Sequence, residues 1–269
     1  MVVADATEAC APRIQFAAQL ARDFDATLLC VAAETISASY FGAISEAGYI
    51  AGELIDAQQS VLEADLRTAE QHFRSATSGQ EAEWVSINGP TLSTITDETC
   101  RADLVVAGRR SGNSFDFNRG SSAADLLLLS GRPVLIAPPE LECLDSQTSM
   151  VAWKDTPQAR RAVADALPLL QRSEKVIVGW AAEETGGDSH SSLERIVEYL
   201  GRHRVIATLE NISDESEDVG MRLLRAAQGS GAGLVVAGAY GHSRAREWVF
   251  GGVTEDLIRH SPVATLMSH

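Results

Sequence analysis

The chain contains an internal repeat, and a repeat of this length constrains the fold more than any single motif does. Residues 103–108 read DLVVAG, and residues 233–238 read GLVVAG, 130 positions later. Further along, residues 120–136 resemble residues 251–267 at an offset of 131. The sequence therefore predicts two diverged copies of one unit, each about half of the 269 residues.

A polar segment with two prolines separates the copies. Residues 138–149 show weak periodicity, so we interpret them as a linker. We place a first domain at residues 1–140 and a second domain at residues 147–269. Units of this size are long enough to bury a core of their own.

Each copy alternates short apolar runs with segments of helical periodicity. In the second copy, residues 157–170 carry apolar side chains at helical spacing between two strand-like runs. Five strands with intervening helices are typical of an α/β, doubly wound parallel sheet, one per copy. Strands are expected at 2–4, 27–31, 82–87, 104–107 and 134–137, and then at 150–153, 176–180, 205–209, 234–237 and 263–267. Helices are expected at 53–75, 157–170, 191–202, 219–227 and 252–259.

The net charge excludes some classes of function. The chain has 22 Lys and Arg against 37 Asp and Glu, for a formal charge of −15. A chain this acidic is repelled by nucleic acid and by anionic membranes, so the expected partner is a small molecule or another protein. No run approaches a membrane span, and the N-terminus lacks the features of a signal peptide. The predicted location is the cytoplasm.

The cysteines give no sign of a disulfide framework or of a metal site. Cys10, Cys30, Cys100 and Cys143 are far apart, and they show no ligand spacing with the six histidines. We expect reduced, mostly buried thiols and no bound metal.

Glycine-rich loops follow the fourth strand of each copy. In the second copy, Gly238 and Gly241 precede Gly251 and Gly252, and Thr254 lies just inside the next helix. Glycines let the backbone approach an anion, and a helix N-terminus supplies unpaired N–H groups. The pattern predicts a phosphate site, although tight strand-to-helix connections would produce the same glycines.

These loops resemble the universal stress protein family, whose motif is G-x2-G-x9-G followed by Ser or Thr. The second copy matches the glycines and has Gly252 in place of the hydroxyl residue. The first copy has Gly108 at the start and Gly120, Ser121 and Ser122 at the end, with Ser111 in place of the second glycine. The resemblance extends over nearly the whole chain and identifies it as similar to tandem members of the family.

The resemblance implies a fold and a ligand. The family's domains are five-stranded sheets of the adenine-nucleotide alpha-hydrolase-like type, with strand order 3-2-1-4-5, and some members bind ATP or AMP. In nucleotide-binding relatives, an aspartate at the end of the first strand faces the adenine and ribose. Asp5 fits that position, and its counterpart in the second copy is Lys154, or Asp155 if the register slips. Members with Gly-Gly at the end of the loop, as in the second copy, are often not nucleotide binders.

Other side chains of the loops leave two interpretations open. Arg109, Arg110 and Arg119 are expected either to neutralise phosphates or to form surface ion pairs with acidic neighbours. His242 could shuttle protons, because histidine titrates near neutral pH. No nucleophile with a fixed partner stands beside it, so the other expectation is that it contacts an anion or packs in its loop. Trp153 and Trp248 fit a core or interface position better than a ligand contact.

The resulting hypothesis is a stress-response regulatory or binding protein and not a fast catalyst. Its closing strands, 134–137 and 263–267, are expected to meet across a two-fold-like interface as an internal pseudo-dimer, with further homodimerisation. The alternatives are a nucleotide-free scaffold for a protein partner, and a slow ATP hydrolase or nucleotidyl transferase.

Overall fold

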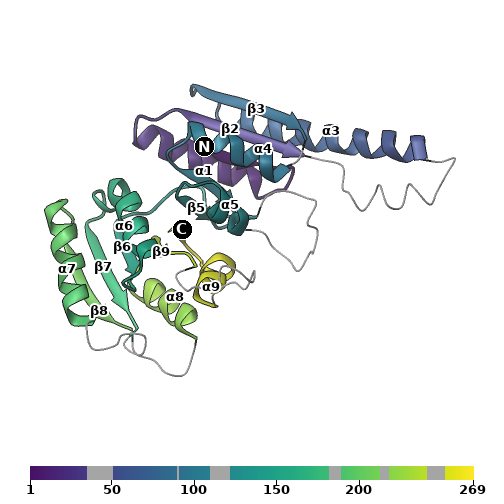
Figure 1. The fold of residues 1–269 in the computed structure, drawn as a ribbon. Coiled ribbons are helices and arrows are strands. Elements are labelled where there is room, and N and C mark those ends of the chain that lie inside the picture. Colours follow the sequence, from purple (N-terminus) through teal and green to yellow (C-terminus); the bar gives the residue numbers. More distant parts are fainter. Residues whose placement is uncertain (35–50, 90, 110–121, 182–188, 213–217, 241–251) are drawn as a thin grey trace.

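The structure is a computed structural model that describes residues 1–34, 51–89, 91–109, 122–181, 189–212, 218–240 and 252–269 (Figure 1). The elements of the first half are β1 (Val2–Ala4), α1 (Cys10–Asp23), β2 (Leu28–Glu34), α3 (Ala51–Ala76), β3 (Ala82–Asn88), α4 (Thr91–Glu98), the 3-10 helix η2 (Thr99–Arg101), β4 (Val105–Gly108), α5 (Ala123–Leu129) and β5 (Val134–Ala137). Those of the second half are β6 (Thr148–Ala152), α6 (Pro157–Leu170), β7 (Lys175–Trp180), α7 (Ser189–Arg202), β8 (Ala207–Asn211), α8 (Val219–Gly229), β9 (Leu234–Gly238), α9 (Gly252–His260) and β10 (Ala264–Ser268).

All of these strands belong to one ten-stranded sheet, in the order β3-β2-β1-β4-β5-β10-β9-β6-β7-β8. Each half by itself has the order 3-2-1-4-5 with parallel neighbours. The predicted α/β fold with two doubly wound units is therefore confirmed, and the two units share a single sheet.

The halves meet where β5 and β10 pair antiparallel at the centre of the sheet. Leu266 lies opposite Leu135, and Met267 lies opposite Val134. An antiparallel pair of equivalent strands is what a two-fold axis generates, so the predicted meeting of the closing strands is confirmed. All four side chains are fully buried, which makes this junction part of the core.

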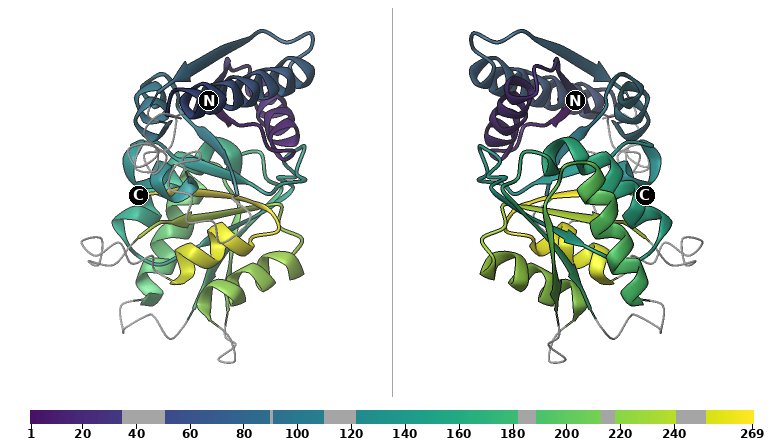
Figure 2. Two further views of the ribbon diagram at one scale, coloured as in Figure 1. Left: turned by 90° about the vertical axis from the view of Figure 1, so that its right-hand side faces the viewer. Right: turned by 90° about the vertical axis from the view of Figure 1, so that its left-hand side faces the viewer.

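Helices cover both faces of the sheet (Figure 2). On one face, α1, α3, α6 and α7 pack through buried side chains such as Phe16, Phe73 and Leu193. On the other face, α4, α5, α8 and α9 pack around residues such as Ile95 and Leu257. Each of the two apolar clusters contains residues from both halves, so the core is continuous across the junction.

Capping residues define the helices that lead into the candidate loops. Thr156 is the N-cap of α6, where its hydroxyl accepts a hydrogen bond from the amide of Ala159 (3.2 Å), and Pro157 occupies the first turn. Ser122 caps α5 in a reciprocal capping box with Asp125. Both helices therefore begin at a residue whose side chain accepts a hydrogen bond from an amide of the first turn.

Two expectations from the sequence are corrected. The predicted linker ends too late, because β6 begins at Thr148 and pairs there with Lys175 of β7. The thiols are not mostly buried: Cys10 and Cys30 are buried, whereas Cys100 and Cys143 are exposed.

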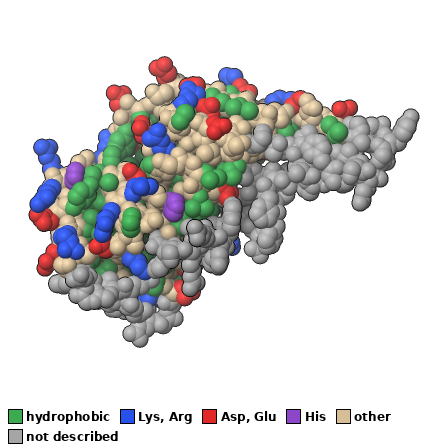
Figure 3. Space-filling model, viewed as in Figure 1, with side chains coloured by type: hydrophobic (Ala, Val, Ile, Leu, Met, Phe, Trp, Pro, Cys, Tyr) green, Lys and Arg blue, Asp and Glu red, His purple; other side chains and the backbone are tan. Residues whose placement is uncertain are grey.

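Charges of both signs share the described surface. On the face that Figure 3 shows, acidic and basic side chains are interspersed and do not gather into one basic patch. Among the described residues, no helix is long and apolar enough to cross a membrane.

Candidate functional site

The reversal of strand order gives each half one candidate binding edge. In an open parallel sheet, ligands bind beyond the carboxyl ends of the strands where the order reverses. In the first half, this point lies between β1 and β4, and in the second half it lies between β6 and β9. The predicted glycine loops follow β4 and β9, so the structure places their first residues at these two points.

Asp5 directly follows β1 and is held by three donors. Its carboxylate accepts hydrogen bonds from the guanidinium of Arg13 (2.6 Å), from the amide of Thr7 (2.9 Å) and from the Thr7 hydroxyl. The Asp5 side chain is 33% exposed, against 6% for its partner Arg13. The pair thus combines a buried cation with a carboxylate that still reaches solvent.

Arg13 is the residue of this site that the sequence reasoning missed. Its Nε donates to the carbonyl of Val3 (2.9 Å), and its guanidinium also lies beside the thiol of Cys10. A Cβ added to Gly108 would lie only 2.0 Å from the Nη1 of Arg13. The guanidinium therefore fills the space beside Gly108 and connects the ends of β1 and β4. The available signal was an arginine on the apolar stripe of α1, next to Ile14 and one turn from Cys10 and Ala17.

Cys10 lies beside this pair, and its surroundings make its thiol a weak nucleophile. Its Sγ accepts a hydrogen bond from the amide of Asp5 (3.3 Å). Burial raises the pKa of the thiol, so the sulfur is neutral at physiological pH and a weak nucleophile.

Ser122 and Arg109 are both engaged with protein partners. The Ser122 hydroxyl accepts from the amide of Asp125 (3.1 Å) and donates to its carboxylate (2.6 Å). Arg109 donates from Nη1 to the carbonyl of Ser261 (2.9 Å), at the end of α9. Neither of the two predicted roles for Arg109 describes this bond, which links the first-half loop to the second half.

The corresponding edge of the second half has different chemistry. Val2 and Val151 pair with the same valine of the repeated LVVAG segment in β4 and β9, so they are equivalent positions. Asp5 lies three residues after Val2, and Lys154 lies three residues after Val151. Lys154 is therefore the counterpart of Asp5, and Asp155 is not. A lysine has donors only, so this edge lacks the acceptor of the first half.

Gly238 packs directly against the backbone of α6. A Cβ at this position would lie 2.4 Å from the amide nitrogen of Ala159, so a glycine is required for this close approach. Thr254 is buried, and its hydroxyl accepts a hydrogen bond from the amide of Tyr240 (3.3 Å). Gly252 is exposed, and a Cβ there would meet no atom within 4 Å, so local space does not demand its glycine.

Tyr240 continues this second loop in a left-handed conformation, with φ of 58°. Its ring contacts the ring of His269 edge to face, with centroids 5.7 Å apart. Burial raises the pKa of the phenol, and the nearby carboxylates of Asp125 and Glu255 add to the effect. Tyr240 is therefore protonated at neutral pH and cannot act as a base.

The structure thus assembles two separate groups of the predicted residues. Asp5 and Gly108 meet through Arg13, and Gly238 and Thr254 meet through the backbone of residues 239–240. The predicted residues Gly120, Ser121, Gly241, His242 and Gly251 lie outside the described residues, as do Arg110, Ser111, Arg119 and Trp248. In the described ranges, no group of three or more His, Cys, Asp or Glu side chains is arranged to hold a metal ion.

Comparison with known proteins matches both halves to one family. The model described as "Universal stress protein family" matches residues 1–138 and 147–269. A universal stress protein from Archaeoglobus fulgidus is similar in structure, with a TM-score of 0.70, 17% identity, and 99% of this chain and 97% of that chain covered. A functionally unknown protein from Pseudomonas aeruginosa PAO1 has a TM-score of 0.50 at 13% identity, with 93% and 84% covered. At such identities these likenesses concern the fold alone. No curated protein matches the chain.

Proposed function

The chain belongs to the universal stress protein family, and on this premise we propose that it is a stress-response regulatory protein that binds an adenine nucleotide, ATP or AMP, in its first half. The main support is that Asp5, Arg13 and Gly108 are in contact at the point where strand order reverses. This point combines an acceptor, a cation and a glycine, which is what recognition of a nucleotide needs.

Each of the three residues has a separate role in this proposal. Asp5 accepts one further hydrogen bond, from a ribose hydroxyl or from the adenine amino group, because a carboxylate has about four acceptor positions and three are in use. Arg13 donates from Nη1 to a phosphate oxygen, in a charge-assisted hydrogen bond. Gly108 leaves room for the Arg13 guanidinium, because a Cβ at this position would lie 2.0 Å from its Nη1.

Nucleotide binding is less well supported in the second half than in the first. Lys154 stands where an acceptor is needed, and the backbone of α6 already occupies the space beside Gly238. We therefore assign the nucleotide to the first half and a structural role to the second-half edge.

One observation favours a second candidate, a nucleotide-free scaffold for a protein partner. The Arg13 guanidinium fills the space beside Gly108 and is tied to Val3 and Asp5. If these bonds hold in solution, they keep the edge closed, and the pseudo-dimer would act through its surface. An enzyme that hydrolyses or transfers nucleotides is the weakest candidate, because Cys10 and Tyr240 are held neutral.

Thermal unfolding with ATP, ADP or AMP separates the two leading candidates. A ligand at 100 times its dissociation constant stabilises by about 2.7 kcal/mol. With an unfolding entropy of about 2.1 cal/mol/K per residue, this raises the Tm of a 269-residue chain by about 5 °C. Asp5→Asn should reduce the shift to about half, since a tenfold weaker affinity halves the linkage free energy at the same ligand concentration.

Asp155→Asn is the matched control, because Asp155 follows β6 but is not the counterpart of Asp5. It should leave the nucleotide-dependent shift unchanged. No shift with any of the three nucleotides would refute the proposal and favour the scaffold.

A further inference from the structure

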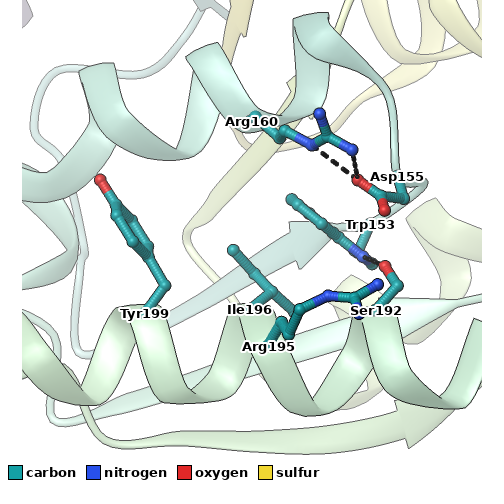
Figure 4. Close-up of a pocket in the computed structure, with 7 residues that line it drawn as sticks. All are labelled: Trp153, Asp155, Arg160, Ser192, Arg195, Ile196 and Tyr199. Atoms are coloured by element: carbon teal, nitrogen blue, oxygen red, sulfur yellow. Dashed lines mark hydrogen bonds and ion pairs between the residues drawn. The ribbon is translucent and has the colours of Figure 1, made fainter.

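A pocket of about 500 Å³ lies between α6 and α7 on one face of the sheet (Figure 4). Its lining includes Trp153, which follows β6, and Ile196 and Tyr199 of α7. Ligand pockets for small organic molecules have volumes of about 300–1,000 Å³. The space is therefore large enough for a molecule of two or three rings.

The apolar wall of the pocket is held in a fixed position. The indole Nε1 of Trp153 donates a hydrogen bond to the hydroxyl of Ser192 (3.0 Å). Both residues are buried, as is Ile196 beside them. A ring held in this way loses no side-chain freedom when a ligand contacts the part of it that remains accessible.

The charged groups of the pocket leave one cation available. Arg160 is paired with Asp155 through Nε (2.7 Å) and Nη2 (2.6 Å), so each of these two charges is neutralised by the other. Arg195 makes no hydrogen bond or ion pair with any residue that the structure describes, and its guanidinium lies beside Trp153 and Ser192 (Figure 4). The lining has a net charge of +1, in a chain whose net charge is −15.

This pocket and the second glycine loop both adjoin the first turn of α6. The backbone of Gln158 and Ala159 faces Gly238 of β9, whereas Asp155 and Arg160 face α7. A molecule in the pocket therefore contacts other residues at the start of α6 than those that Gly238 contacts.

We propose that the pocket binds a small planar aromatic anion, such as an aryl carboxylate or an aryl sulfonate. Its rings lie against Trp153 and Ile196, and its anionic group accepts hydrogen bonds from the Arg195 guanidinium. Contact with the indole and with Ile196 provides the apolar part of the binding, and the planar fork of arginine matches the two oxygens of such an anion.

The test uses 8-anilino-1-naphthalenesulfonate as a probe, with saturable binding followed by fluorescence and by calorimetry. The native chain should bind one equivalent at this site. Arg195→Ala should weaken binding by about tenfold, the lower end for a hydrogen bond to a charged group, and Arg195→Glu should weaken it more. Arg195 is exposed, so both variants should keep the fold, as circular dichroism would verify.

Arg202→Glu is the matched control, since Arg202 lies two turns further along α7 and pairs with Glu198 outside the pocket. It should leave the dissociation constant unchanged. The uncharged analogue N-phenyl-1-naphthylamine should bind at least tenfold more weakly than the sulfonate. The proposal is overturned if the probe shows no saturable binding, if Arg195→Glu and Arg202→Glu bind it equally well, or if AMP displaces it competitively.

Discussion

The junction between the halves should make the whole chain unfold as one unit, and Leu266→Ala tests this. Leu266 is fully buried in β10 opposite Leu135 of β5, and the apolar cluster around both contains residues of each half. Truncation of a fully buried leucine costs about 3–4 kcal/mol, from lost burial and the remaining cavity. The unfolding entropy of 269 residues is about 0.6 kcal/mol/K. The lost free energy divided by this entropy gives a decrease in Tm of about 5–7 °C.

Hydrogen exchange followed by mass spectrometry during denaturation measures each half separately. Peptides from β2 and β7 should lose protection in one transition, and that transition should shift for both when Leu266 is truncated. If the halves were independent, the second half alone would melt earlier, by about 12–15 °C, because its unfolding entropy is less than half as large. That result would refute the reasoning. Leu209→Ala is the control, since Leu209 is 39% exposed on the edge strand β8.

Three further predictions concern the sites and their supports. Gly238→Ala should lower the free energy of unfolding by about 2 kcal/mol or more, because the new methyl group would meet the backbone of α6; an unchanged free energy of unfolding in urea denaturation would contradict the packing described. Thr156→Ala should cost about 1 kcal/mol through loss of the N-cap of α6, and an unchanged urea midpoint would show that the cap is unimportant. Cys10 and Cys30 should react with a disulfide reagent only after unfolding, because burial raises the pKa of both thiols, whereas rapid modification of all four cysteines in the native chain would rule out this burial.

Local patterns predicted several elements at both ends, and the predicted strands 2–4 and 134–137 coincide with β1 and β5. The predicted helix 157–170 agrees with α6 at both ends, because Thr156 and Pro157 mark its start. The predicted strand 205–209 is two residues early against β8. Val205 is buried and apolar, but it precedes the ladder with β7, which begins at Ala207, and β8 itself is largely exposed. Strand limits depend on the partner strand, which the local pattern does not contain.

The site could be predicted only in its main-chain features. The repeat and the glycines located the ends of β4 and β9, and the resemblance to the family assigned Asp5 to the end of β1. The contacts that decide the chemistry come from long side chains that reach across elements: Arg13 to Gly108, and Arg109 to Ser261. Such contacts depend on the angle and distance between packed elements, and neither follows from periodicity.

A tandem chain allows its two candidate edges to diverge, which a homodimer of identical subunits cannot do. Arg109 directly follows Gly108 and binds the carbonyl of Ser261 in the other half. Its counterpart after Gly238 is Ala239, whose methyl side chain has no donor to make the reverse bond. The first-half loop is therefore tied by a side chain to the end of α9, without an equivalent arginine in the opposite direction. Since this loop begins beside Asp5 and Arg13, the edge that has the acceptor and the cation is also the edge that is linked directly to the other half.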